Sequence, residues 1–422
     1  MEYPRKSRLY YGWYVLAASF VILFFNSGAR YSFGVMFKPM VADLGWSRGS
    51  ISLAFFLNMT VYALSNIAVG RFYDRYGPKW VIILSTLFIG AGYSLISVIG
   101  SLWEFYLYYG FFAAIGMGGT SIPLLAVLIS RWFEKWRGLA ISLALSGSCL
   151  GHFVMIPAIT FITLHFGWRS SYLAMGLVMF IVNLSLVLLV IGRDPGSSSQ
   201  DPLGKKEEEK LRDQGSVVKR SQPQDLSFVE AARTPSFWLF AAVMFICGSG
   251  DFLVSTHLIP FATDQGISPV AAGNMLAWLG FTSFVGVLLA GPASDLVGNR
   301  IPLMLTFLLR VISYILILKF RTVASFYIFA LVFGLTFLTT APLSTTLLGR
   351  IYGFSNIGLI SGFINTLHHL GGGLWAYLGG WAFDRTGSYL PIFVVSAVLA
   401  SVALICTIFI SERRHERFQA SA

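Results

Sequence analysis

The stretch GRFYDRYGPK at residues 70–79 is matched 221 residues later by GPASDLVGNR at residues 291–300. Each copy has a glycine, an aspartate four positions on, a second glycine three positions further and a basic residue two beyond that. Two other loops show the same offset, and their matched residues are Pro39 and Pro260, Asp43 and Asp264, Gly45 and Gly266, and Ser47 and Ser268. One constant offset at separate places predicts that the chain contains two copies of the same structural unit.

The composition is typical of a membrane protein. Hydrophobic residues make up 56% of the 422 residues and charged residues only 12%, against about 25% charged in a soluble domain. Apolar runs long enough to cross a bilayer, which takes about 20 helical residues, recur along the chain. We expect twelve spans, at residues 11–38, 50–70, 80–100, 103–130, 138–164, 170–192, 236–261, 270–291, 301–319, 322–348, 357–379 and 389–411. The sequence therefore predicts an all-α membrane protein with twelve transmembrane helices in two pseudo-symmetric six-helix bundles.

One polar segment divides the spans into two equal sets. It is rich in Ser, Lys, Glu and Gln, which predicts a cytoplasmic linker without a core of its own. We expect an N-terminal bundle over residues 1–192, the linker over 193–233 and a C-terminal bundle over 234–422. The apolar run that follows the basic residues at the start is a full span without a small-residue cleavage site, so no cleavable signal is expected.

The net charge of +11 reflects membrane topology rather than a nucleic-acid partner. With both termini in the cytoplasm, cytoplasmic segments carry 22 of the 30 Lys and Arg residues, which is the bias that orients membrane proteins. The three cysteines fall inside predicted spans without metal-ligand spacing, and are Cys149, Cys247 and Cys406. We therefore expect packing roles for them, with no disulfide, no metal and no cofactor.

Ionisable side chains inside the spans are candidates for function, because a charge near the bilayer centre costs about 2.5–3.5 kcal/mol. Six qualify, and they are Arg30, His152, Asp251, Arg310, His368 and His369. Arg30 and Asp251 lie 221 residues apart, so the duplication places them at equivalent points of the first and seventh spans. Two prolines, Pro123 and Pro342, predict kinks in the fourth and tenth spans.

The loop at residues 70–79 resembles the signature Gly-x-x-x-Asp-Arg-x-Gly-x-Lys of the major facilitator superfamily, and the second copy fits the same family. Further segments resemble bacterial members of its monocarboxylate porter and oxalate–formate antiporter branch, namely YYGWYVLAASF (10–20), RYSFGVMFKPM and ADLGWSR (within 30–48), SRWFEKWRGLA (130–140), FGWRSSY (166–172) and THLIPFATDQGIS (256–268). The resemblance covers nearly the whole chain. It implies gating roles for Gly70, Asp74, Arg75, Gly77, Lys79, Gly291, Asp295, Gly298 and Arg300.

The resemblance also implies a function. It predicts a secondary carrier in the bacterial cytoplasmic membrane, working by alternating access as a monomer, with a small organic acid and often protons as its partners. One position departs from the pattern: many relatives carry an arginine in the eighth span, four residues before the repeated glycine, where this chain has Val287. Monocarboxylates, dicarboxylates, larger amphipathic acids and neutral compounds therefore all stay open as substrates.

In the implied fold the first and seventh spans face each other across the substrate cavity. We predict that Arg30 binds the substrate carboxylate, because arginine grips carboxylates with two hydrogen bonds. We predict that Asp251 binds the coupling proton and pairs with Arg30 when the site is empty. A permanent structural ion pair between the two halves is the alternative. Arg310 belongs to a helix that is usually peripheral in this fold, where it would pair with another segment or reach towards the interface.

Other residues complete the predicted site. Substrate contacts are expected from Asn26, Tyr31, Tyr109, Thr340 and His369. His152 and His368 are candidates for proton coupling because histidine titrates near neutrality, and packing roles are equally open for them. Proton symport of an organic anion is the favoured mechanism, and exchange of two anions, which needs no titratable group, is the alternative. The sequence has no enzyme-like Ser–His, paired-aspartate or metal motif and no channel filter, so neither class is expected.

Overall fold

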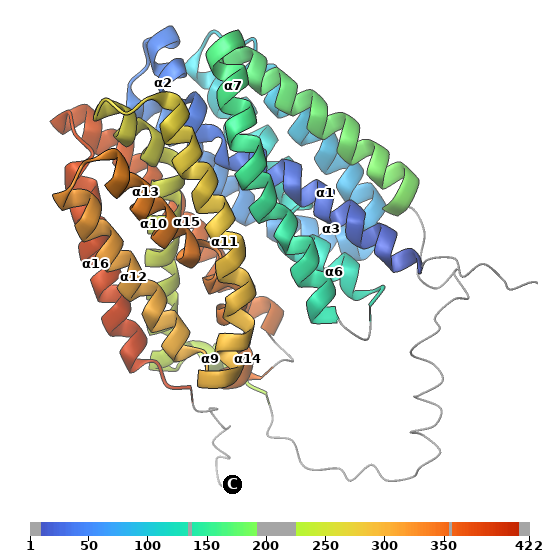
Figure 1. Ribbon diagram of the computed structural model, residues 1–422. Helices are drawn as coiled ribbons and strands as arrows, with labels where there is room; N and C mark the ends of the chain where they lie inside the picture. Colours follow the sequence, from blue (N-terminus) through green and yellow to red (C-terminus); the bar gives the residue numbers. More distant parts are fainter. Residues whose placement is uncertain (1–9, 134–136, 192–224, 354–356, 413–422) are drawn as a thin grey trace, which may run out of the picture.

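The computed structural model describes residues 10–133, 137–191, 225–353 and 357–412. The described residues fold into helices without any strand, and the helices form two bundles that lie side by side (Figure 1). The N-terminal bundle contains α1 (Tyr11–Tyr31), α2 (Phe33–Leu44), α3 (Arg48–Ile96), α4 (Leu102–Phe105), the π-helix η1 (Tyr106–Ala113), α5 (Ala114–Gly119), α6 (Ile122–Ser130), α7 (Arg137–Leu186) and the π-helix η2 (Val187–Ile191).

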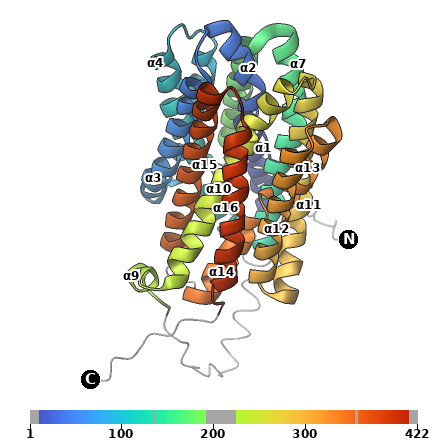
Figure 2. The ribbon, with the colours of Figure 1, turned by 90° about the vertical axis from the view of Figure 1, so that its left-hand side faces the viewer.

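The C-terminal bundle contains α9 (Phe228–Ala232), α10 (Pro235–Asp264), α11 (Pro269–Val297), α12 (Arg300–Lys319), α13 (Val323–Phe337), α14 (Thr340–Tyr352), α15 (Ile357–Thr386) and α16 (Leu390–Phe409). The start of α1 and the end of α16 lie at the same end of the molecule as α9 and α14, whereas α2 and α4 lie at the other end (Figure 2). We call these the terminal end and the closed end.

The twelve expected spans are all present. Nine helical stretches of the described chain are long and apolar enough to cross a membrane. Two of them, α3 and α7, each contain two spans that meet at a glycine with positive φ, 79° at Gly77 and 82° at Gly167. Together with α15, which is also long enough to cross a bilayer at 30 residues, this division gives twelve spans. The predicted fold class is therefore confirmed.

The duplicated loops have the same local backbone. Their four matched glycines all have positive φ, 67° at Gly45, 82° at Gly266, 79° at Gly77 and 81° at Gly298. Ser47 and Ser268 both cap the following helix, since each side-chain oxygen accepts a hydrogen bond from a backbone N–H three residues on. Glycine adopts positive φ without steric cost, and serine is a favoured cap, so the repeated residues specify repeated turns.

The predicted kinks are also confirmed. The fourth span is interrupted between Gly119 and Ile122, just before Pro123, and the tenth between Phe337 and Thr340, just before Pro342. Proline lacks a backbone N–H and cannot continue the hydrogen-bond ladder of the preceding turn. Of the expected linker, residues 193–224 lie outside the described residues, whereas residues 225–233 include the short helix α9, which begins at a Ser227–Glu230 capping box.

Candidate functional site

Among the described residues, the most extensive contacts between the two bundles are those of α2 with α10, α3 with α15 and α7 with α11. Small residues permit these contacts. A Cβ at Gly34 would lie 2.7 Å from the carbonyl oxygen of Ser255, and a Cβ at Gly380 would lie 2.5 Å from that of Arg48. Helices in a membrane associate through such close packing because lipid supplies no hydrophobic drive between them.

Charged groups reinforce the contact at the closed end. Asp264, the last residue of α10, pairs with Lys38 of α2 at 2.8 Å and accepts a hydrogen bond from Nη2 of Arg48 at 3.0 Å. Asp384 accepts two more from the backbone N–H groups of Arg48 and Gly49, at 3.0 and 2.7 Å. Two aspartates of the C-terminal bundle therefore hold the start of α3 and the end of α2.

The first glycine and the aspartate of each signature loop, at the terminal end, make no such contacts with the described residues. A Cβ at Gly70 or Gly291 would have no neighbouring atom within 4 Å. Asp74 and Asp295 are exposed, and neither has an ion pair or a side-chain hydrogen bond within the described part of the chain. Neither glycine therefore brings two helices close together in this conformation, in which the bundles meet at the opposite end.

The remaining signature residues make local contacts only. Arg75 is exposed, with its guanidinium 5.2 Å from the ring centre of Tyr76. Lys79 follows the turn at Gly77 and is half-buried. Arg300 donates a hydrogen bond to the carbonyl of Ile408 in its own bundle. In this conformation none of these contacts joins the two bundles.

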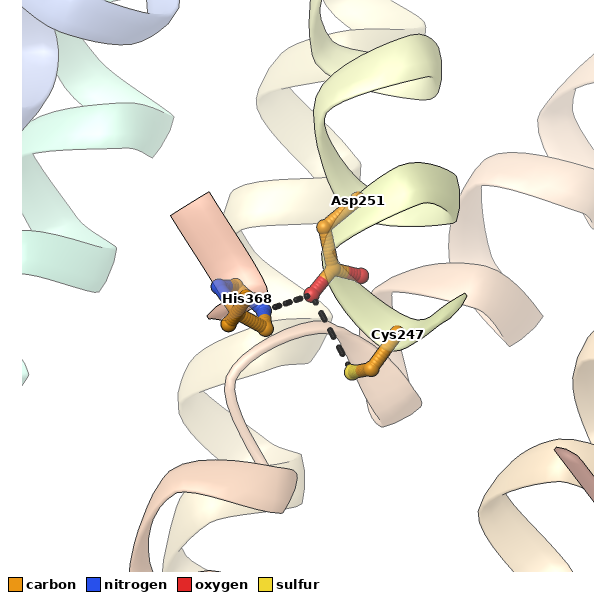
Figure 3. Close-up of side chains that lie close together, drawn as sticks. All are labelled: Cys247, Asp251 and His368. Atoms are coloured by element: carbon orange, nitrogen blue, oxygen red, sulfur yellow. Dashed lines mark hydrogen bonds and ion pairs between the residues drawn. The ribbon is translucent and has the colours of Figure 1, made fainter. Parts of the chain in front are cut away.

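Near the middle of the C-terminal bundle, three spans bring charged groups together. Nη2 of Arg310, from α12, lies 2.7 Å from Oδ1 of Asp251 in α10. Nε2 of His368, from α15, lies 3.2 Å from Oδ2 of the same carboxylate, and Sγ of Cys247 lies 3.5 Å from it (Figure 3). Asp251 and Arg310 are only 3% and 2% exposed, so the pair is shielded from solvent.

The expected pairing of Asp251 with Arg30 is not observed. Asp251 instead has Arg310 as its counter-ion, and Arg310 is central to the bundle rather than peripheral. The sequence did not predict the pair of Asp251 and Arg310, because the duplication relates positions in the first and seventh spans. The cation nearest to Asp251 comes from the ninth span instead. The signal that was available is the charge of Arg310 itself, since a buried guanidinium requires an acidic partner.

Arg30 lies where the bundles meet and has no acidic partner among the described residues. Its guanidinium lies 4.1 Å from the ring centre of Tyr62 and 5.6 Å from that of Phe252, with Nη2 3.5 Å from Sδ of Met59. The ring of His369 lies 4.9 Å from Tyr62 and 5.6 Å from Phe252. We call these five residues, contributed by both bundles, the Arg30 cluster.

A second contact between bundles surrounds His152. Its imidazole stacks on Tyr31 with 4.4 Å between ring centres, and Phe337 of α13 lies 5.4 Å from Tyr31 and 5.9 Å from His152. His152 is 1% exposed, and neither ring nitrogen has a hydrogen-bond partner within the described residues. Buried polar atoms are normally paired, so these nitrogens are available to a bound molecule.

Three predicted contact residues lie elsewhere. Asn26 is buried inside the N-terminal bundle, where its Oδ1 accepts a hydrogen bond from Asn183. Tyr109 is 1% exposed and packs on Phe33 at 5.0 Å in the same bundle. Thr340 lies beside Cys247, with Oγ1 3.4 Å from Sγ. We therefore leave Asn26 and Tyr109 out of the site, because both side chains are buried within their own bundle.

The fold, two six-helix bundles joined at one end with charged groups at mid-depth, defines a membrane transporter rather than an enzyme. Residues 19–280 and 240–422 match the family model of the Major Facilitator Superfamily. The chain belongs to this superfamily, and it is a multi-pass membrane transporter.

Its relatives include carriers of organic anions. The uncharacterized MFS-type transporter YcxA of Bacillus subtilis (strain 168) is 27% identical over 399 residues, which cover 93% of each chain. Monocarboxylate transporter 13 of Bos taurus is 26% identical over 94% of this chain and 89% of the relative. The oxalate:formate antiporter of Oxalobacter formigenes is 26% identical over 61% of this chain and 57% of the relative.

Solved structures share the fold. The nucleoside transporter NupG matches with a TM-score of 0.74 at 10% identity, over 95% of this chain and 99% of that chain. A bacterial homologue of the human lysosomal transporter Spinster, in an inward-facing and occupied conformation, matches with a TM-score of 0.70 at 17% identity, over 96% and 95%. At these identities the likeness supports the architecture only.

Proposed function

We propose that this transporter moves a small organic anion with one carboxylate across the bacterial cytoplasmic membrane by alternating access, together with a proton. The observation that carries the proposal is the unpaired charge of Arg30. Arg310 is neutralised by Asp251 at 2.7 Å, which leaves Arg30 as a cation without an acidic partner between the bundles, within the described residues. A carboxylate bound there would supply the missing counter-ion.

The surroundings of Arg30 suit a carboxylate with an apolar body. Tyr62 and Phe252 lie beside the guanidinium, and His369 reaches the same two rings. One cation among aromatic groups favours one negative charge, because a second carboxylate would be buried without a partner. The names of two relatives, a monocarboxylate transporter and an oxalate:formate antiporter, support an organic anion as substrate, and the first supports a single carboxylate.

Asp251 is the proposed proton site. Its carboxylate is shared between Arg310 and His368, so a proton gained by Asp251 or lost by His368 changes the charge of the whole group. His152, beside Tyr31, is a second candidate on the other side of the contact between bundles. Proton binding would weaken the attraction between α10 and α12 and alter the packing of α10 against the N-terminal bundle.

The conformation fits a carrier that opens towards the cytoplasm. We place both termini in the cytoplasm on the basis of the charge bias, which makes the closed end extracellular. Asp264 and Asp384 then seal the outer side, while the signature loops at the terminal end are apart. In the opposite, outward-open state, we propose that the signature loops make the contacts that they lack here.

Transport by purified protein in liposomes, with a pH-sensitive dye inside, tests this proposal. Arg30→Gln should weaken binding of monocarboxylates about 10- to 100-fold, because hydrogen bonds to a charged group contribute about 1.5–3 kcal/mol. Arg321→Gln, which removes an exposed loop arginine, is the matched control and should transport normally. Unchanged affinity in the Arg30 variant would remove Arg30 from the site.

Anion exchange is the second candidate. It is favoured by the same unpaired cation, since an exchanger needs a site for one anion at a time and no titratable group. The liposome experiment separates the mechanisms: symport acidifies the lumen without any internal anion, whereas exchange requires one. Asp251→Asn should abolish acidification in a symporter while retaining exchange of labelled substrate, and acidification that persists in this variant would exclude Asp251 as the proton site.

A further inference from the structure

Cys247, Asp251 and His368 place three different metal-binding atoms around one small volume (Figure 3). Oδ2 of Asp251 lies 3.2 Å from Nε2 of His368 and 3.5 Å from Sγ of Cys247, and all three atoms lie within 4.8 Å of one another. Zinc holds sulfur at about 2.3 Å and nitrogen or oxygen at about 2.0–2.2 Å, so donor atoms around a tetrahedral ion lie about 3.3–3.6 Å apart. Small side-chain rotations would therefore bring all three into contact with an ion.

Groups behind these donors hold them in place. Arg310 binds Oδ1 of Asp251 at 2.7 Å, which leaves Oδ2 directed at the other two donors. Oγ1 of Thr340 lies 3.4 Å from Sγ of Cys247, where it can donate a hydrogen bond to a thiolate. In established metal sites, side chains that bind the ligands as Arg310 and Thr340 do here orient those ligands and stabilise their anionic forms. Cys247 and Asp251 lie one turn apart on α10, and His368 comes from α15, so the cluster does not depend on a flexible loop.

The donor set selects the type of ion. A thiolate, a carboxylate and a neutral imidazole supply two negative charges, which match a divalent cation. Magnesium and calcium require mainly oxygen ligands, and the positive charge of Arg310 disfavours ions held by charge alone. Zinc and cobalt bind sulfur and nitrogen strongly. Three protein ligands with a free fourth position are the arrangement found when zinc also binds water or another small ligand.

We propose that Cys247, Asp251 and His368 form a binding site for a divalent transition-metal ion, Zn²⁺ above all. The ion would enter from the side of His368, because the side chain of His368 is 14% exposed whereas that of Asp251 is 4% exposed. The proposal stands on the geometry of the cluster and does not depend on the proposed transport mechanism.

Cobalt absorption in purified, tag-free protein tests the site. Wild-type protein should bind one Co²⁺ per chain, with a thiolate-to-cobalt absorption band in the near ultraviolet that one equivalent of Zn²⁺ removes. Cys247→Ser should lose the band, and His368→Gln should bind at least about tenfold more weakly, since even outer partners of a metal site contribute that much. Cys149→Ser and Cys406→Ser are the matched controls and should keep the band.

X-ray absorption of zinc-loaded wild-type protein tests the same metal site without any variant. One sulfur neighbour of zinc at about 2.3 Å is expected. A coordination shell of nitrogen and oxygen alone would overturn the site. A cobalt band that persists in Cys247→Ser would do the same. A wild-type protein that shows no cobalt band would likewise refute the metal site, whatever its transport activity.

Discussion

At the scale of single residues, the ion pair of Arg310 and Asp251 is the main electrostatic feature. Removing two charges from water costs several kcal/mol per ion, and a buried pair recovers this only with further hydrogen bonds. Arg310 has them, because its guanidinium donates to the carbonyl oxygens of Cys247 and Thr336 at 3.1 and 3.0 Å. The two residues therefore act as one unit: loss of Asp251 leaves Arg310 without its counter-ion, and loss of Arg310 leaves Asp251 with His368 alone.

Breaking this unit should be costly. Arg310→Gln should lower the stability of the folded protein by about 3–5 kcal/mol, the usual effect of removing one partner of a buried pair. The double variant Arg310→Gln with Asp251→Asn should recover much of the loss, because two amides can bond without charge. Thermal unfolding in detergent measures both. A double variant no more stable than the single one would show that the two charges are independent.

At the scale of helices, the repeated loops have equal backbones but different partners. Asp43, in the last turn of α2, pairs with Arg169 and accepts a hydrogen bond from Nε1 of Trp168 at 3.1 Å, both within the N-terminal bundle. Its equivalent, Asp264, pairs across the bundles with Lys38 and Arg48. Among the contacts of the described residues, only those of the second aspartate therefore connect the two halves, although the two loops resemble each other in sequence.

This difference predicts unequal effects of the same substitution. Asp264→Asn should open the closed end, because it removes the charge that holds α2 and α3 against α10. A cysteine introduced at Thr256, which is fully buried and contacts α2 near Gly34, should then react faster with a membrane-impermeant maleimide. Asp43→Asn is the matched control and should leave the rate unchanged. Equal rates in the two variants would contradict a role for Asp264 in closure.

At the scale of the whole molecule, the two bundles meet at one end and are apart at the signature loops. A carrier with two access states must exchange these contacts, so groups that are unpaired in one state are expected to pair in the other. Asp74 and Asp295 are exposed here. The closed end, by contrast, has the ion pair of Lys38 with Asp264 at 2.8 Å. The signature aspartates are therefore expected to stabilise the alternative state, in which the end that is closed here is open.

Asp74→Asn should accordingly slow turnover more than it weakens binding. We expect about a tenfold lower maximal rate, equivalent to about 1.4 kcal/mol, with substrate affinity changed less than about twofold because Asp74 is remote from Arg30. Initial rates of uptake and equilibrium binding on the same preparation separate the two quantities. Arg71→Gln, an exposed neighbour on α3, serves as the control. A loss confined to affinity would contradict a role in gating.

Local rules determined much of this protein from the sequence alone. Apolar length specified the spans, glycine at positions such as Gly77 and Gly298 specified the turns with positive φ, and Pro123 and Pro342 specified the interruptions. Each of these features depends on a few neighbouring residues, so each can be read without knowing what the segment packs against. The duplication could be recognised for the same reason, because repeated residues give repeated turns.

The tertiary structure alone decided which charged groups meet. Sequence spacing indicates which face of a helix a side chain occupies, but not which other helix covers that face. Asp251 therefore pairs with Arg310, 59 positions along the chain, rather than with its repeat equivalent Arg30, and His368 joins Cys247 from a distant span. The unpaired state of Arg30 follows from that packing, because in a lipid-enclosed bundle a buried carboxylate is bound by whichever cation the helix arrangement brings nearest.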